Sequence, residues 1–162
     1  MRAATCRHYG SPDVIRIEDV ERPMPKADEV LVAVHSTSVT SGDARMRSFK
    51  GAGIFWLPMR LIFGVLRPRN PFSGMEFSGR IAEIGKDVTT FRVGDSVFGM
   101  KIGGANAEYV AVRETAAIAS KPDSLGFSDA AVAPFGALSA LAFLRDFAKL
   151  KAGERILIHG AS

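Results

Sequence analysis

The end of the chain combines an apolar run with a small-residue turn, a pattern found in phosphate-binding sites. Residues 156–158 (Ile-Leu-Ile) predict a strand, and Gly160, Ala161 and Ser162 follow shortly after it. A glycine at such a turn lets backbone N–H groups approach a pyrophosphate at the N-terminus of the next helix. These three residues are therefore candidate dinucleotide contacts. An ordinary connection after a strand has the same pattern.

A basic window lies in the first half of the chain. Residues 44–75 include no Asp or Glu but six cationic side chains: Arg45, Arg47, Lys50, Arg60, Arg67 and Arg69. Such a patch beside apolar residues attracts an anionic ligand, a nucleotide phosphate or a membrane surface, or it forms a solvated rim. We expect no nucleic-acid binding, because the window lacks interleaved stacking aromatics and any helix-turn-helix or zinc-finger spacing.

Residues 54–66 are apolar on nearly every face, with Arg60 as the only charge. The segment is too short to span a bilayer. It is either a buried packing element or a lid over an apolar substrate cleft, since a segment that is apolar all round must be covered. As a lid, it would line the substrate side with Trp56, Leu57, Leu61 and Phe63.

Short strands are predicted for most of the chain. Val- and Ile-rich runs with partial alternation indicate strands at residues 2–8, 14–20, 29–39, 77–85, 95–99 and 106–112. Many short strands at this spacing predict a sandwich or a barrel. Ser128 and Asp129 can cap a helix over residues 130–149, with a break near Pro134 and Gly136.

The composition predicts a full globular domain and the start of another. The chain has 162 residues, of which 47% are apolar, and a net charge of +4. This is enough for a sizeable core. Cys6 is the only cysteine, so an internal disulfide and a cysteine-based zinc cluster are excluded. The N-terminus has no apolar segment typical of a signal peptide, and we expect a cytoplasmic protein.

Three stretches carry a family resemblance when they are taken together. They are Gly-Met-Glu-Phe-Ser-Gly at 74–79, Thr-Phe-Arg-Val-Gly-Asp-Ser-Val-Phe-Gly at 90–99, and the region 130–140 leading to Ile-His-Gly-Ala-Ser at 158–162. In this order they resemble the medium-chain dehydrogenases/reductases. The resemblance implies an α+β protein that is mainly β. A GroES-like, partly open β-barrel catalytic domain would cover residues 1–125. Connecting helices and the first strand of a truncated Rossmann domain would cover residues 126–162.

The resemblance also implies a nicotinamide cofactor, NADP(H) or NAD(H), bound mainly by a Rossmann half absent from this sequence. Zinc-type members of the family hold their metal with a Cys and a His at positions that correspond here to Thr40 and Met75. A hydroxyl and a thioether are poor zinc ligands, so we expect no metal site. We expect Glu76 to be a structural carboxylate and His8, His35 and His159 to be structural.

Without a Lewis acid, the chemistry that remains is hydride delivery to a quinone or an α,β-unsaturated carbonyl. The chain thus resembles the zinc-independent quinone oxidoreductase and enoyl reductase branch. The implied protein is a catalytic-domain fragment, inactive alone, of an NAD(P)H-dependent enzyme that reduces a small apolar carbonyl or quinone. Quinone oxidoreductases often carry Asn-Pro-x-Asp and a nearby Tyr where this chain has residues 40–45, so no general acid is assigned.

The resemblance places candidate catalytic roles on Thr40, Ser41 and Asp43. It places cofactor contacts on Thr40, Arg45, Ser139 and residues 160–162. Each candidate has a structural alternative. Thr40 and Ser41 can form a strand-end turn, Asp43 can cap a helix, Arg45 can face solvent, and Ser139 can bond a preceding helix carbonyl.

Two other functions stay open. One is a zinc-type alcohol dehydrogenase relative with an unusual metal site. The other is a non-enzymatic membrane or interaction module that uses residues 45–69, although we expect membrane binding less than catalysis. The apolar residues at 130–149 and 156–158 also predict self-association, which points to a homo-oligomer.

Overall fold

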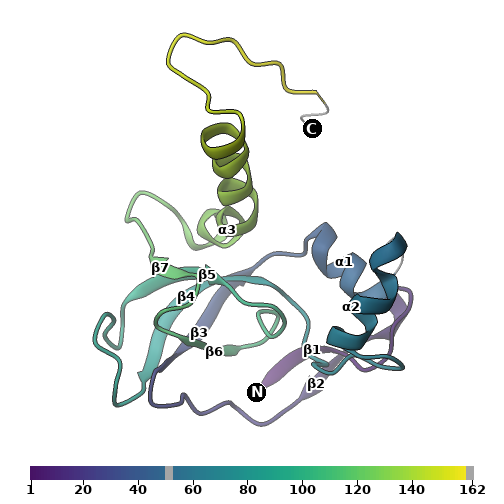
Figure 1. Ribbon diagram of the computed structural model, residues 1–162. Coiled ribbons are helices and arrows are strands. Elements are labelled where there is room, and N and C mark those ends of the chain that lie inside the picture. The colour runs from purple at the N-terminus through teal and green to yellow at the C-terminus, as the bar shows by residue number, and fades with distance from the viewer. Residues whose placement is uncertain (50–52, 160–162) are drawn as a thin grey trace.

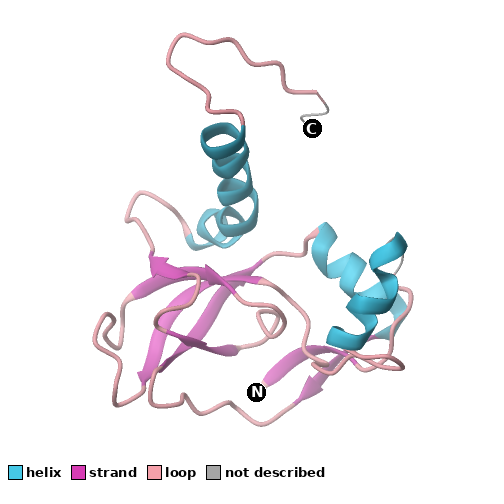
Figure 2. Cartoon of the chain, viewed as in Figure 1, coloured by secondary structure: helices cyan, strands magenta, loops and turns pink. Residues whose placement is uncertain are grey.

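The computed structural model describes residues 1–49 and 53–159 of the chain (Figure 1). The structure combines two antiparallel sheets with a few helices, so the predicted α+β fold is confirmed (Figure 2). The smaller sheet pairs β1 (Arg2–Cys6) with β2 (Ile15–Asp19). The larger sheet has the order β6 (Tyr109–Arg113), β3 (Glu29–Thr37), β4 (Glu76–Ile84), β5 (Ser96–Met100) and β7 (Ile118–Ser120).

The core lies against the central strands of the larger sheet. Val30 and Val32 of β3, Phe77 and Ile81 of β4 and Val97 of β5 are all at most 2% exposed. Alternate residues of a strand share one face, so these apolar side chains lie on the same side of the sheet and pack against one another. All six predicted strands are present, with ends shifted by a few residues, while the short β7 was not predicted.

Two helices lie beside each other above the small sheet (Figures 1 and 2). They are α1 (Ser41–Ser48) and α2 (Trp56–Phe63), which follows a 3-10 turn at Gly53–Phe55. The alternative that residues 54–66 are buried packing is wrong for the described residues: α2 has no buried residue, and Ile54 is 89% exposed. The segment meets the rest of the chain on one side only.

Helix α3 (Phe127–Leu141) packs on β3, β4 and β5 and then stands away from the sheet (Figure 1). Its N-cap is Gly126, with no side-chain cap, so the predicted capping by Ser128 and Asp129 is wrong. The predicted break at Pro134 is also absent, because α3 runs through this proline and continues as a π-helical segment, Ala142–Phe147. By length and apolar composition alone, Phe127–Phe147 is a candidate membrane span, a test that core helices of soluble proteins also pass.

The strand predicted at residues 156–158 is not formed. These residues are extended coil, and Leu157 is 92% exposed. A strand is maintained by hydrogen bonds to a neighbouring strand, and none of the described residues pairs with this segment. The first Rossmann strand of the predicted fold is therefore absent from the structure.

Candidate active site

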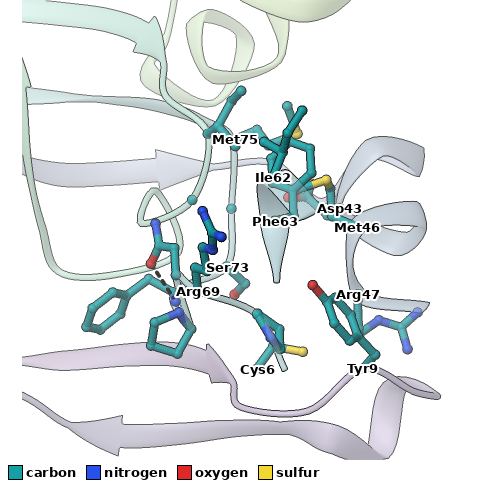
Figure 3. Close-up of a pocket in the computed structure, with 17 residues that line it drawn as sticks. Cys6, Tyr9, Asp43, Met46, Arg47, Ile62, Phe63, Arg69, Ser73 and Met75 are labelled. Carbon is teal, nitrogen blue, oxygen red and sulfur yellow. Dashed lines mark hydrogen bonds between the residues drawn. The ribbon is translucent and has the colours of Figure 1, made fainter. Parts of the chain in front are cut away.

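A cavity of about 290 Å³ lies where α1, α2, the end of β1 and the loop before β4 meet (Figure 3). Apolar side chains make up much of its wall: Met46, Ile62, Phe63, Phe72, Met75 and Ile102. Concave, mostly apolar cavities with a few polar groups are typical sites for small molecules, which usually occupy about 300–1,000 Å³. This cavity is at the small end of that range.

Two glycines shape the loop that borders the cavity. Gly64 follows α2 with φ = 123°, and its carbonyl oxygen accepts a hydrogen bond of 2.9 Å from the Tyr9 hydroxyl. Gly74 has φ = 91°, and a Cβ there would lie 2.3 Å from the backbone nitrogen of Asn106. Only glycine combines this backbone conformation with such close approach, so both positions fix the path of the loop.

Thr40 and Asp43 form a capping box at the start of α1, next to the cavity. Asp43 Oδ2 accepts hydrogen bonds of 2.8 Å from both the backbone N–H and the hydroxyl of Thr40, and Asp43 N–H donates to Thr40 Oγ1 at 3.2 Å. The predicted helix cap at Asp43 is confirmed, and Asp43 also lines the cavity. Ser41 is exposed, and its hydroxyl has no hydrogen-bond partner among the described residues.

Thr40 and Met75, the two positions expected in place of zinc ligands, both lie close to Gly42. The Met75 sulfur and the Thr40 hydroxyl oxygen each lie 3.2 Å from the point that a Cβ on Gly42 would occupy. The adjacent Glu76 is 2% exposed, and its carboxylate accepts hydrogen bonds from the Ser38 hydroxyl and, at 2.6 Å, from the Phe135 backbone N–H.

This donor set does not fit zinc. Catalytic zinc takes three protein ligands from thiolate, imidazole and carboxylate groups, whereas Thr40 and Met75 offer a hydroxyl and a thioether, and both oxygens of Glu76 are engaged. Over residues 1–49 and 53–159, no group of three or more His, Cys, Asp or Glu side chains could hold a metal ion.

Two arginines line the cavity, against a single acidic residue, Asp43. Arg47 donates from Nη1 to the Gly10 carbonyl oxygen at 3.2 Å. The guanidinium of Arg69 has no hydrogen-bond or ion-pair partner in the part of the chain that the structure describes. Two arginines and one aspartate give the lining a formal net charge of +1, which favours a positive potential in the cavity.

Cys6 and Tyr9 complete the wall on the β1 side. Burial raises the pKa of the Cys6 thiol, and the positive charge of Arg47 offsets part of that rise. Burial also raises the pKa of Tyr9, which the charge of Arg60 partly opposes. Both groups are thus protonated at neutral pH, and the Tyr9 hydroxyl is occupied by the Gly64 carbonyl oxygen.

Comparison with known proteins identifies the fold around this cavity. The family model for the alcohol dehydrogenase GroES-like domain matches residues 26–123, more than half of the chain. The chain belongs to this GroES-like family. The match confirms the predicted membership of the medium-chain dehydrogenase/reductase superfamily, and the larger sheet is the curled half-barrel of the GroES-like domain.

Relatives of this GroES-like chain are oxidoreductases. Quinone oxidoreductase from Sus scrofa is 31% identical over 100% of this chain and 46% of its own length. The CurK enoyl reductase structure has a TM-score of 0.83 at 26% identity, covering 98% of this chain and 46% of that one. A mycobacterial protein solved with NADPH has a TM-score of 0.78 at 28% identity, covering 95% and 44%. The chain spans about half the length of the curated relatives it matches.

The GroES-like structure brings only one of the four expected substrate-lining residues to the cavity. Phe63 lines it, but Trp56, Leu57 and Leu61 do not, and these three are 45%, 60% and 56% exposed. The helix α2 turns one face toward the cavity, with Ile62 and Phe63 at its C-terminal end, and leaves the other face in solvent.

The expected cofactor contacts of the GroES-like chain are not brought together. Arg45 is exposed on α1 and does not line the cavity. Ser139 is half-buried in α3, and its hydroxyl has no hydrogen-bond partner among the described residues, so the expected bond to a helix carbonyl is absent. Gly160, Ala161 and Ser162 lie outside the described residues.

Sequence reasoning did not single out Cys6, Tyr9, Arg47 or Arg69 as cavity residues. For the two arginines a signal existed, because both fall in the acid-free window, for which an anionic ligand was one alternative beside a membrane surface and a solvated rim. For Cys6 and Tyr9 there was none. They reach the cavity because the end of β1 passes under the loop of residues 68–75, with Cys6 N–H donating to the Pro71 carbonyl oxygen at 2.6 Å.

Proposed function

We propose that the chain is the catalytic part of a zinc-independent, NAD(P)H-dependent oxidoreductase that reduces quinones or α,β-unsaturated carbonyls. One observation carries the proposal. Thr40 and Met75 offer a hydroxyl and a thioether where zinc would need its ligands, and Met75 also lines a mostly apolar cavity that has two arginines and one aspartate. Quinone oxidoreductase and enoyl reductase relatives support both substrate classes equally.

The cavity residues suit such a reduction. The bound nicotinamide cofactor would supply a hydride. The substrate oxygen then gains negative charge, which a positive potential in apolar surroundings stabilises. The side chains of Phe63, Phe72 and Ile102 exclude water from a flat substrate. Asp43 holds Thr40 in place at the start of α1, while Ser41 is exposed and does not line the cavity, so its catalytic role requires a substrate that extends toward the start of α1.

The described residues do not enclose a dinucleotide, because the cavity has room for a small molecule only. We therefore place most cofactor contacts outside the described residues, with Arg45, Ser139 and residues 160–162 as contributors. A division near residue 125, between the GroES-like domain and a cofactor domain, is part of this proposal. So are a cytoplasmic location, self-association through α3, and the absence of nucleic-acid binding.

The test is NADPH consumption by the full-length protein with 1,4-quinones and with 2-alkenals, in the presence of a metal chelator. The proposal expects turnover with at least one class. Activity that appears only after zinc is added would assign the protein to the zinc-type dehydrogenases. No turnover with or without zinc would favour a non-enzymatic module that uses residues 45–69.

A further inference from the structure

The cavity carries more positive charge than a neutral carbonyl compound needs. Its two cations, Arg47 and Arg69, face one acidic residue, Asp43. The Asp43 carboxylate accepts two hydrogen bonds of 2.8 Å from Thr40 and forms no ion pair with either arginine among the described residues. The nearest acidic residues along the chain are beyond both ends of the window 44–75.

The guanidinium of Arg69 is exposed and donates no hydrogen bond to the described residues. Among residues 1–49 and 53–159 its guanidinium meets no carboxylate and no carbonyl oxygen within bonding distance. Figure 3 draws this side chain among those that line the cavity, below Met75 and beside Phe63 in that view. A guanidinium offers a planar fork of N–H donors that matches the two oxygens of a carboxylate.

Arg60, in the same basic window, has the contacts of an arginine with a structural role. Arg60 donates from Nη1 to the Val65 carbonyl oxygen at 2.6 Å, and its guanidinium carbon lies 4.2 Å and 4.6 Å from the ring centroids of Tyr9 and Phe49. Arg60 therefore packs α2 against Tyr9 and Phe49. Arg69 is exposed and makes no such contact with the described residues, so its guanidinium is available to a ligand in the cavity that it lines.

We propose that the cavity selects quinone or enone substrates that carry an acidic group, a carboxylate or an equivalent oxyanion, and that Arg69 binds this group. The inference rests on the proposed function of the same site. Arg47 adds to the positive potential without being the direct partner, since it is turned to Gly10. Arg69 is exposed, so solvent screens this ion pair and its strength is modest, and the volume of about 290 Å³ favours a compact ring or a short chain.

The experiment compares two probes with the full-length protein and NADPH. They are a 1,4-naphthoquinone with a propanoate side chain and its methyl ester, which share the same redox-active ring. The variants are Arg69→Gln, Arg69→Lys and the control Arg67→Gln, which removes an equal charge from a nearby arginine that is also exposed but does not line the cavity. Calorimetric binding of both probes without cofactor gives a second readout that needs no turnover.

We expect the acid to be preferred over the ester, and Arg69→Gln to lower kcat/KM for the acid by about tenfold, the loss of one charge-assisted hydrogen-bonded contact. The ester, the KM for NADPH and the Arg67→Gln variant should be unchanged, and Arg69→Lys should restore part of the preference. Weaker binding of the acid to Arg69→Gln should accompany the loss.

Three results would overturn the inference. Turnover of both probes with no preference for the acid would do so while leaving the proposed function intact. An equal loss for acid and ester in Arg69→Gln would assign Arg69 to the reacting oxygen instead. A raised KM for NADPH would assign it to the cofactor. Selective binding of the acid without any turnover would uphold the anion site and reject the proposed reductase.

Discussion

The carboxylate of Glu76 accepts a hydrogen bond of 2.6 Å from the backbone N–H of Phe135. This contact joins β4 to α3 directly after Pro134, the residue that lacks a backbone donor. A proline inside a helix displaces the carbonyl of the preceding turn, and the carboxylate here engages the N–H that follows. The other oxygen of Glu76 takes the Ser38 hydroxyl, so one buried side chain connects the end of β3, β4 and α3.

Replacing Glu76 should therefore destabilise the whole fold. Glu76→Ala leaves the Phe135 N–H and the Ser38 hydroxyl without a partner in a buried place, which costs about 3 kcal/mol of unfolding free energy. Glu76→Gln keeps an acceptor for Phe135 and can donate to Ser38, so about 1 kcal/mol is expected. Urea denaturation measures both values. Equal stability of the alanine variant and the parent would contradict this bridging role.

The capping box predicts a smaller, local effect. Thr40→Ala removes the oxygen that accepts from Asp43 N–H and the hydroxyl that donates to Asp43 Oδ2, so it should lower stability by about 1 kcal/mol. Thr40→Ser keeps both bonds and should lose much less. Ser41→Ala is the matched control, because its hydroxyl is exposed and unpartnered in the described structure. A loss at Ser41 equal to that at Thr40 would reject the capping role.

Sequence patterns predicted the strands because most of them, β3, β4, β5 and β6 among them, bury apolar residues, and the apolar pattern is local. Helix ends were harder. Pro134 indicated a break, but a carboxylate on a strand far away in sequence engages the neighbouring N–H, which no local pattern reveals. The strand at 156–158 was predicted from its apolar residues, although a strand also needs a neighbour.

The candidate site was predictable only in part. The positions Thr40 and Met75 were singled out by resemblance, and the structure places both beside Gly42. The cavity wall was not predictable, because it is assembled from β1, α1, α2 and a loop that are separate in sequence. Trp56 and Leu57 were expected there from apolar character alone, which does not say which face of α2 they occupy.

Arg60 should hold α2 against the rest of the molecule. Its guanidinium carbon lies 4.2 Å from the Tyr9 ring centroid, 4.6 Å from that of Phe49 and 5.3 Å from that of Trp56. Arg60→Ala should release α2, shift the emission of Trp56, the only tryptophan, to longer wavelength, and cost about 2 kcal/mol. Arg60→Lys should give an intermediate emission shift. Arg67→Ala is the control, and an identical spectrum for Arg60→Ala and the parent would contradict the prediction.

Alkylation of Cys6 should report the electrostatic potential inside the cavity. The thiolate is the reactive form, and Cys6 is the only cysteine, so the pH at which the alkylation rate reaches half its maximum follows one group. Burial raises the pKa of Cys6 above the ordinary 9.0, and the charge of Arg47 pulls it back down. In the native protein this midpoint should lie above 9.0, and urea-unfolded protein should show the ordinary value.

Because a cation favours the thiolate, Arg47→Gln should move the native midpoint to still higher pH. Arg45→Gln removes the same charge from the exposed side of α1 and should leave it unchanged. An identical shift in both variants would mean that the thiol senses net charge rather than Arg47, and the positive potential assigned to the cavity would then lose its support.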